Sequence, residues 1–165
     1  MSSLLRRVRA LPLLLLLAAC AAFQPAAEQQ PPVVFVHGNG DTAALWHTTM
    51  WRFETNGYDR KLLHAVDFSN PLARSDDAKP QPLRSSTADQ MAELARNVAD
   101  VRKRTGRDMV VLIGNSRGGN AIRNYVKNGG GAAYVSHAIL SGAVNHGVSD
   151  WEETRGSEFN AKGRS

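Results

Sequence analysis

Met109-Val110-Val111-Leu112-Ile113-Gly114-Asn115-Ser116-Arg117-Gly118-Gly119 carries the strongest structural signal in this 165-residue chain. Its unbroken apolar start predicts a short strand buried on both faces, as in a parallel sheet. The strand leads directly into Gly114-x-Ser116-x-Gly118, and a helix is expected over about residues 117–127. A serine on such a sharp turn has a strained backbone and a projecting hydroxyl group. Glycines are expected at 114 and 118 because side chains there would collide with the neighbouring strand and helix.

Upstream of this stretch, the sequence predicts two further strands and one helix. Val33-Val34-Phe35-Val36 is a second buried run, and it ends in His37-Gly38-Asn39-Gly40. A helix is expected from about Thr42 to Asn56-Gly57, with Asp41 as its N-cap. A strand is then expected over residues 62–66. Residues 67–86 are rich in Ser, Pro, Asp and Lys without periodicity, which predicts a loop.

A long amphipathic helix is expected between this loop and the Ser116 turn. Thr87-x-x-Gln90 has the pattern of a capping box. The apolar residues that follow recur on one helical face: Met91, Leu94, Ala95, Val98 and Val101. After the Ser116 helix, Gly129-Gly130-Gly131 predicts a stop, and a fourth strand is expected over residues 134–140. Strands that alternate with helices predict an α/β fold with a mostly parallel four-stranded sheet.

Composition suits one globular domain, with 42% hydrophobic and 21% charged residues. The formal charge of +5 is concentrated at the N-terminus, where Arg6, Arg7 and Arg9 together contribute three positive charges. Residues 102–107 hold another basic cluster, but it falls at the end of the predicted long helix, where cations complement the helix dipole. No aromatic residues alternate with it as a single-strand-binding surface requires. We therefore expect no nucleic-acid partner.

The N-terminus has the pattern of a secretory signal peptide over residues 1–19. Three arginines precede an apolar run that is about half of the ~20 residues needed to span a bilayer. Leu17-Ala18-Ala19-Cys20 also resembles a bacterial lipobox, which implies lipidation of Cys20 and a periplasmic or outer-membrane-anchored lipoprotein. An ordinary cleaved signal is the alternative. Residues 20–31 are expected to form a flexible tether, and residues 32–165 the folded domain.

The His-Gly turn after the first strand, together with the Gly-x-Ser-x-Gly turn, resembles the α/β-hydrolase superfamily, especially its bacterial lipase and esterase branch. The resemblance implies that Ser116 is the nucleophile. It implies that the backbone N–H groups of Asn39 and Arg117 form the oxyanion hole and that His37 is structural. The expected substrate is a small-molecule or lipid ester, with thioesters, polyesters and amides left open. No cofactor is implied.

A serine nucleophile also needs a base and a carboxylate, which this superfamily supplies in the order Ser, acid, His. No histidine follows an acidic residue after Ser116 in the chain. His146 with Asp150 is the internal alternative, if the tail folds back over the turn; no third ligand makes this pair a metal site. We expect an N-terminal fragment of a longer hydrolase, with the fourth strand as an exposed apolar edge. The second hypothesis is a non-catalytic fragment or a lipid-anchored binding module.

Overall fold

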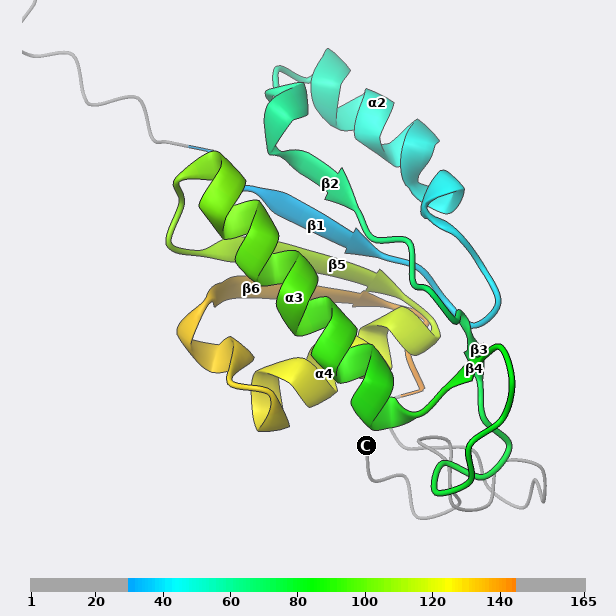
Figure 1. The fold of residues 1–165 in the computed structure, drawn as a ribbon. Coiled ribbons are helices and arrows are strands. Elements are labelled where there is room, and N and C mark those ends of the chain that lie inside the picture. Colours follow the sequence, from blue (N-terminus) through cyan, green and yellow to red (C-terminus); the bar gives the residue numbers. More distant parts are fainter. Residues whose placement is uncertain (1–29, 145–165) are drawn as a thin grey trace, which may run out of the picture.

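The computed structural model describes residues 30–144, which contain a four-stranded, fully parallel sheet in the order β2-β1-β5-β6 (Figure 1). Its strands are β1 (Val33–Val36), β2 (Leu63–Ala65), β5 (Val110–Asn115) and β6 (Val135–Ser141). Its α-helices are α2 (His47–Thr55), α3 (Thr87–Thr105) and α4 (Arg117–Asn128). Single turns of 3-10 helix are η1 (Ala43–Trp46), η2 (Arg60–Leu62) and η3 (Gly131–Ala133). The predicted order of four strands and three helices is confirmed.

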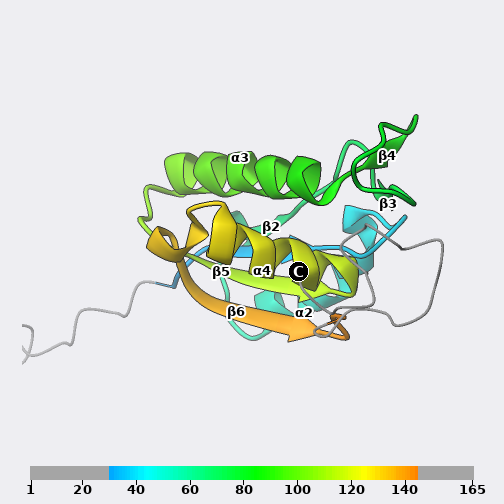
Figure 2. The same ribbon diagram turned by 90° about the horizontal axis from the view of Figure 1, so that it is seen from below.

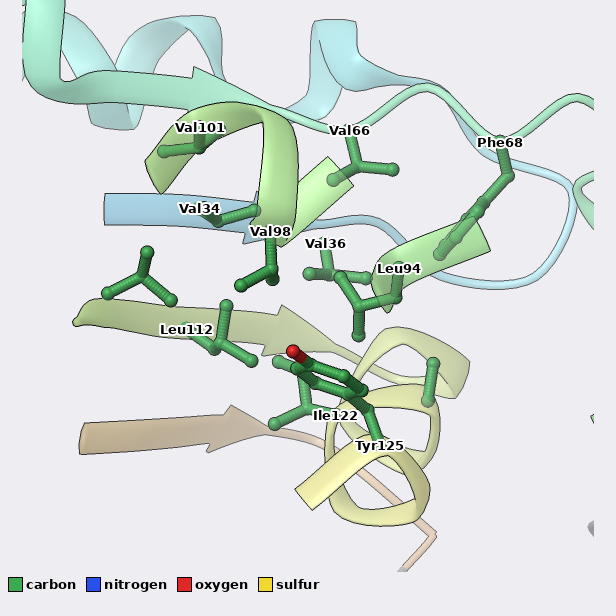
Figure 3. Packing of buried hydrophobic residues seen from close by; sticks show 12 residues of the cluster. Val34, Val36, Val66, Phe68, Leu94, Val98, Val101, Leu112, Ile122 and Tyr125 are labelled. Carbon is green, nitrogen blue, oxygen red and sulfur yellow. The ribbon is translucent and has the colours of Figure 1, made fainter. Parts of the chain in front are cut away.

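The sheet buries a different hydrophobic cluster on each face because successive side chains of β1 point in opposite directions. Val34 and Val36 pack with the apolar residues of α3 and α4, whereas Val33 and Phe35 pack with η1 and α2. Figure 2 shows α3 and α4 on the opposite side of the sheet from α2. Figure 3 shows the first of these clusters between the sheet and its two helices. All four β1 residues are at most 2% exposed, as expected for a strand buried on both faces.

The predicted amphipathic face of α3 is confirmed, since Leu94, Val98 and Val101 are buried. The capping box lies one residue earlier than predicted. The Ser86 hydroxyl accepts a hydrogen bond from the Asp89 N–H (3.0 Å), and Asp89 Oδ2 accepts one from the Ser86 N–H (2.9 Å). The predicted partner Gln90 is 1% exposed and packs inward, so its side chain does not cap the helix.

Two other details differ from the predictions. Thr42 is the N-cap of η1, accepting from the Ala44 N–H at 3.3 Å, whereas Asp41 accepts from the Thr42 N–H one residue earlier. Residues 67–86 are not a plain loop, because β3 (Leu72–Ala73) pairs in parallel with β4 (Arg84–Ser85). Both strands lie beyond the carboxyl ends of β1 and β5 (Figure 1).

The fourth strand β6 forms one edge of the sheet, as predicted. It pairs with β5 on one side, and most of its residues are exposed, including Ile139 at 53%. This strand is therefore the least covered part of the sheet among residues 30–144.

The expected signal peptide and Cys20 lie outside the described residues. Gln30 and Pro31 already contact the fold: the Gln30 side chain bonds to Gly57 and Asp59, and the Tyr58 hydroxyl donates to the Pro31 carbonyl. Across residues 30–144, no helix combines the length and apolarity that a membrane span requires.

Replacement of Leu94 tests the core between the sheet and α3. Leu94 is 0% exposed, so Leu94→Ala removes buried contacts and leaves a cavity, which costs about 2–5 kcal/mol of unfolding free energy. Urea unfolding followed by circular dichroism measures the loss. Leu83→Ala, at a residue 78% exposed, is the matched control and is expected to leave the midpoint nearly unchanged. Equal midpoints for both variants would contradict the described core.

Candidate active site

Ser116 lies at the sharp turn between β5 and α4 and has φ +52° and ψ −125°. Positive φ is uncommon for residues other than glycine and is sterically costly. Hydrogen bonds on both sides hold the turn: the Ser116 N–H donates to the Ser141 carbonyl, and the Ser116 carbonyl accepts from the Gly119 N–H, both at 2.9 Å. The predicted strained turn is therefore present.

The steric need for two glycines in this turn is confirmed. A Cβ added at Gly118 would lie 2.3 Å from the Val36 carbonyl oxygen and 2.5 Å from that of His37. A Cβ at Gly114 would lie 2.8 Å from the backbone of α4. The first turn of α4 thus rests directly on the end of β1, and the helix N-terminus is brought to the carboxyl edge of the sheet.

The His-Gly turn after β1 reaches the serine turn. A Cβ added at Gly38 would lie 3.1 Å from the Ser116 Cβ, so these two segments touch. Asn39 follows Gly38, and Arg117 follows Ser116. The two expected oxyanion donors, the N–H groups of Asn39 and Arg117, therefore each lie one residue after the contact between Gly38 and Ser116.

His37 is fully buried beneath this contact, and both of its ring nitrogens have partners. Nε2 accepts a hydrogen bond from the Phe68 N–H (3.2 Å), and Nδ1 lies 2.8 Å from the Gly38 carbonyl oxygen. In this network Nε2 acts as the acceptor, and Nδ1 is assigned as the donor to the Gly38 carbonyl. Asp67 lies 4.0 Å from Nε2, beyond hydrogen-bond distance. The imidazole holds the end of β1 against Phe68, which fits a structural role.

None of the other described histidines lies at the Ser116 turn. His137 is exposed on β6, and His47 and His64 line a separate cavity of about 310 Å³ between β2, α2 and α3. Burial, together with Arg104 and Arg60, lowers the pKa of His64. His146 and Asp150 lie outside the described residues. Residues 30–144 contain no cluster of three or more metal-ligating side chains.

Sequence reasoning missed the role of the Arg117 side chain. This side chain is 1% exposed, although it carries a charge. Its guanidinium donates to the Pro71 carbonyl (3.1 Å), the Ser85 hydroxyl (3.0 Å) and the Ser85 carbonyl (2.9 Å). The available signal was an arginine in the first turn of a helix that packs on the sheet. Its partners are mainly backbone carbonyls, which the sequence does not distinguish.

Asp89 balances the positive charge near this arginine. Hydrogen bonds from the Ser86 backbone and side chain lower the pKa of Asp89, and the charges of Arg74 and Arg117 lower it further. Arg74 also pairs directly with Asp89 (2.8 Å). The N-terminus of α3 is thereby connected electrostatically to the Ser116 turn.

A parallel sheet in the order β2-β1-β5-β6, with a strained Gly-x-Ser-x-Gly turn after β5, defines a partial α/β-hydrolase fold. The family model described as lipase (class 2) matches residues 30–159. The chain therefore belongs to the class 2 lipase family.

Solved structures agree with this fold. The mature form of the Bacillus licheniformis lipase BlEst2 is 25% identical, with 75% of this chain and 46% of that chain covered and a TM-score of 0.54. A polyneuridine aldehyde esterase is 24% identical, with coverages of 70% and 41% and a TM-score of 0.52. The esterase EaEST from Exiguobacterium antarcticum is 22% identical, with coverages of 75% and 42% and a TM-score of 0.51. The last two show likeness of fold alone. The chain spans less than half the length of each of these proteins.

The lowered pKa of Asp89 predicts a pH-dependent contribution to stability. A carboxylate whose native pKa is depressed stabilises the fold above its ordinary pKa of about 3.9 and loses that effect as pH falls through the native value. Asp89→Asn should therefore be less stable than wild type at pH 7, and the difference should shrink as pH falls below the ordinary pKa and through the lowered native pKa of Asp89. Urea midpoints measured from pH 7 to pH 2 test this. Asp108→Asn, at an exposed residue after α3, is the control. A difference that stays constant with pH would contradict the assignment.

Proposed function

We propose that this chain is the nucleophile-bearing part of an exported serine ester hydrolase of the lipase or esterase type. The strained Ser116 turn in contact with Gly38 is the observation that carries the proposal. At this contact the Ser116 residue and the N-terminus of α4 lie beside the main chain of Asn39 and Arg117, the two expected N–H donors. Family membership supports the same chemistry.

The proposed reaction proceeds through an acyl-enzyme. Ser116 Oγ attacks the ester carbonyl carbon while a base takes the hydroxyl proton, and the carbonyl oxygen becomes a tetrahedral oxyanion. The N–H groups of Asn39 and Arg117 bind that oxyanion; each such donor contributes about 3 kcal/mol in enzymes of this kind. Collapse expels the alcohol, which takes the proton, and leaves Ser116 acylated. Water then attacks the acyl group, releases the acid and restores the hydroxyl.

We propose further that residues 1–165 alone turn over esters little or not at all. Both nitrogens of His37 are occupied, and the remaining described histidines lie elsewhere. Histidine and acid also do not occur in the required order after Ser116. The alternative is a lipid-anchored, non-catalytic binding module.

Export and anchoring are proposed from the N-terminal residues. A basic start, a short leucine-rich run and Cys20 after two alanines favour a cleaved signal and lipidation of that cysteine. Lipidation would place the domain at a membrane surface, close to lipid esters. One acyl chain alone binds a membrane only weakly, whereas two or more anchor it stably.

Fluorophosphonate labelling tests the nucleophile. We expect intact mass spectrometry of the purified chain to show one phosphonyl group, slowly added because no base assists. We expect this adduct to be absent in Ser116→Ala and present in Ser136→Ala, a control at an exposed serine of β6. Equal labelling of wild type and Ser116→Ala, or no labelling of wild type, would reject Ser116 as an activated nucleophile.

The intact mass of the native protein tests both remaining proposals. An antibody against residues 87–104 recovers the protein from its own cells. A species well above 17.9 kDa, after allowance for lipid, supports a base and an acid supplied by further residues. A mass change of the N-terminal peptide that is lost in Cys20→Ser supports lipidation. Ester turnover by residues 1–165 that disappears in His146→Ala would overturn the proposed inactivity.

A further inference from the structure

The side chain of Arg117 is held in an unusual environment. Arginine is rarely buried completely, because removal of its charge from water is costly unless its N–H groups are bonded. Here the side chain is 1% exposed, and its guanidinium donates to the Pro71 carbonyl and to the hydroxyl and carbonyl of Ser85. These acceptors belong to the segment that contains β3 and β4. The residue after Ser116 is thus fastened to a segment more than thirty positions away in sequence.

The same segment also holds the His-Gly turn. Asn39 Oδ1 accepts a hydrogen bond from the Ala73 N–H (2.7 Å), and the Gly40 N–H donates to the Pro71 carbonyl oxygen (3.1 Å). The Pro71 carbonyl therefore accepts from both sides: from Gly40 and from the Arg117 guanidinium. A Cβ added at Gly40 would lie 3.0 Å from Leu72 Cδ2, so the turn also packs closely on β3.

We propose that Pro71, Leu72, Ala73 and Ser85 form a positioning clamp, the β3–β4 clamp, for the oxyanion hole. The clamp grips the side chains of Arg117 and Asn39 and so fixes the separation of the two main-chain N–H groups next to them. This inference rests on the proposed function, because it assigns these N–H groups to the oxyanion. The clamp residues themselves do not touch the substrate.

The physical reason lies in preorganisation. Two N–H groups stabilise an oxyanion only if both are already within about 2.7–3.1 Å of its position before charge develops. Asn39 and Arg117 come from different turns, which would move independently if Gly38 and Ser116 were their only contact. A shared acceptor at Pro71 makes displacement of one turn strain the other.

Arginine suits this position better than lysine or an apolar residue. Its planar guanidinium offers five N–H groups in fixed directions, so one side chain can bond to several acceptors at once. The clamp is in turn anchored to α3. The Arg74 N–H donates to the Ser85 carbonyl (3.1 Å), and the Arg74 guanidinium pairs with Asp89 in the capping box (2.8 Å).

Amide hydrogen exchange and Ser116 labelling of the full chain test the clamp together. The variants are Arg117→Lys and Arg117→Met, with Ser85→Ala as a milder change that keeps the Ser85 carbonyl. Lys127→Met, an exposed residue on the same helix, is the matched control. We expect the Arg117 variants to accelerate exchange of the Gly40 and Ala73 N–H groups by about tenfold or more while amides of β1 and β5 stay protected. Ser85→Ala should give a smaller acceleration at the same two amides.

The second readout is the rate of Ser116 phosphonylation. Loss of one oxyanion donor slows such reactions by about 10²–10³, so a displaced donor should lower the second-order rate constant by roughly tenfold or more. In the wild-type adduct, the Asn39 and Arg117 amide protons should shift downfield as they bond to the phosphonyl oxygen. Arg117→Met should reduce the shift at Asn39, which a purely local defect at residue 117 would not do.

The outcomes separate the clamp from the nucleophile. Unchanged exchange at Gly40 and Ala73 overturns the clamp, whatever the labelling. Faster exchange with an unchanged rate of labelling also overturns it, since the donors would then not depend on the clamp. If wild-type Ser116 is never labelled, the proposed function fails, and the oxyanion role of the clamp fails with it. The exchange data still show in that case whether the two turns are coupled. If Arg117→Met loses protection at all amides, that variant is destabilised as a whole. The clamp is then judged by whether Ser85→Ala accelerates exchange at Gly40 and Ala73.

Discussion

The close approach of α4 to the end of β1 governs the candidate site. Gly118 has room for no side chain, since any Cβ would lie within 2.5 Å of two carbonyl oxygens of that strand end. This approach puts the helix N-terminus at the sheet edge, next to Ser116 with its positive φ. It also makes Gly38 touch Ser116. The strain at one residue is tolerated because the core beneath, from Val36 to Leu112 and Ile122, is almost completely buried.

The chemistry at this edge depends on which groups are left unsatisfied by the fold. His37 lies close to the turn, but its side chain fits a structural role, because its two nitrogens bond to Phe68 and Gly38. An imidazole with both nitrogens bonded within the fold has no free nitrogen to take the proton of a serine. The proposed nucleophile and its expected oxyanion donors therefore belong to the described fold, whereas His37 is not expected to be the proton acceptor.

Much of this fold could be predicted because β1 and β5 are continuous apolar runs and α3 has a regular apolar face. The glycines of the serine turn could be predicted because their steric role is local. The capping residue of α3 was missed by one position, since Ser86 and Thr87 are chemically equivalent caps and only the burial of Gln90 decides between them. β3 and β4 were missed for another reason. Each has two residues, and their pairing is set by contacts with Asn39 and Arg117 that have no sequence pattern.

The order of the strands restricts how the site can be completed. β5 carries Ser116 and lies between β1 and β6. The β1 side is occupied by the His-Gly turn, by Ala73 of β3, which bonds Asn39, and by Pro71, whose carbonyl accepts from Arg117. On the other side, the end of β6 borders the serine turn through the hydrogen bond from Ser116 to Ser141. Under the proposed function, the side of Ser116 toward β6 is therefore where we expect a base to approach, because β6 is an edge strand of the described sheet.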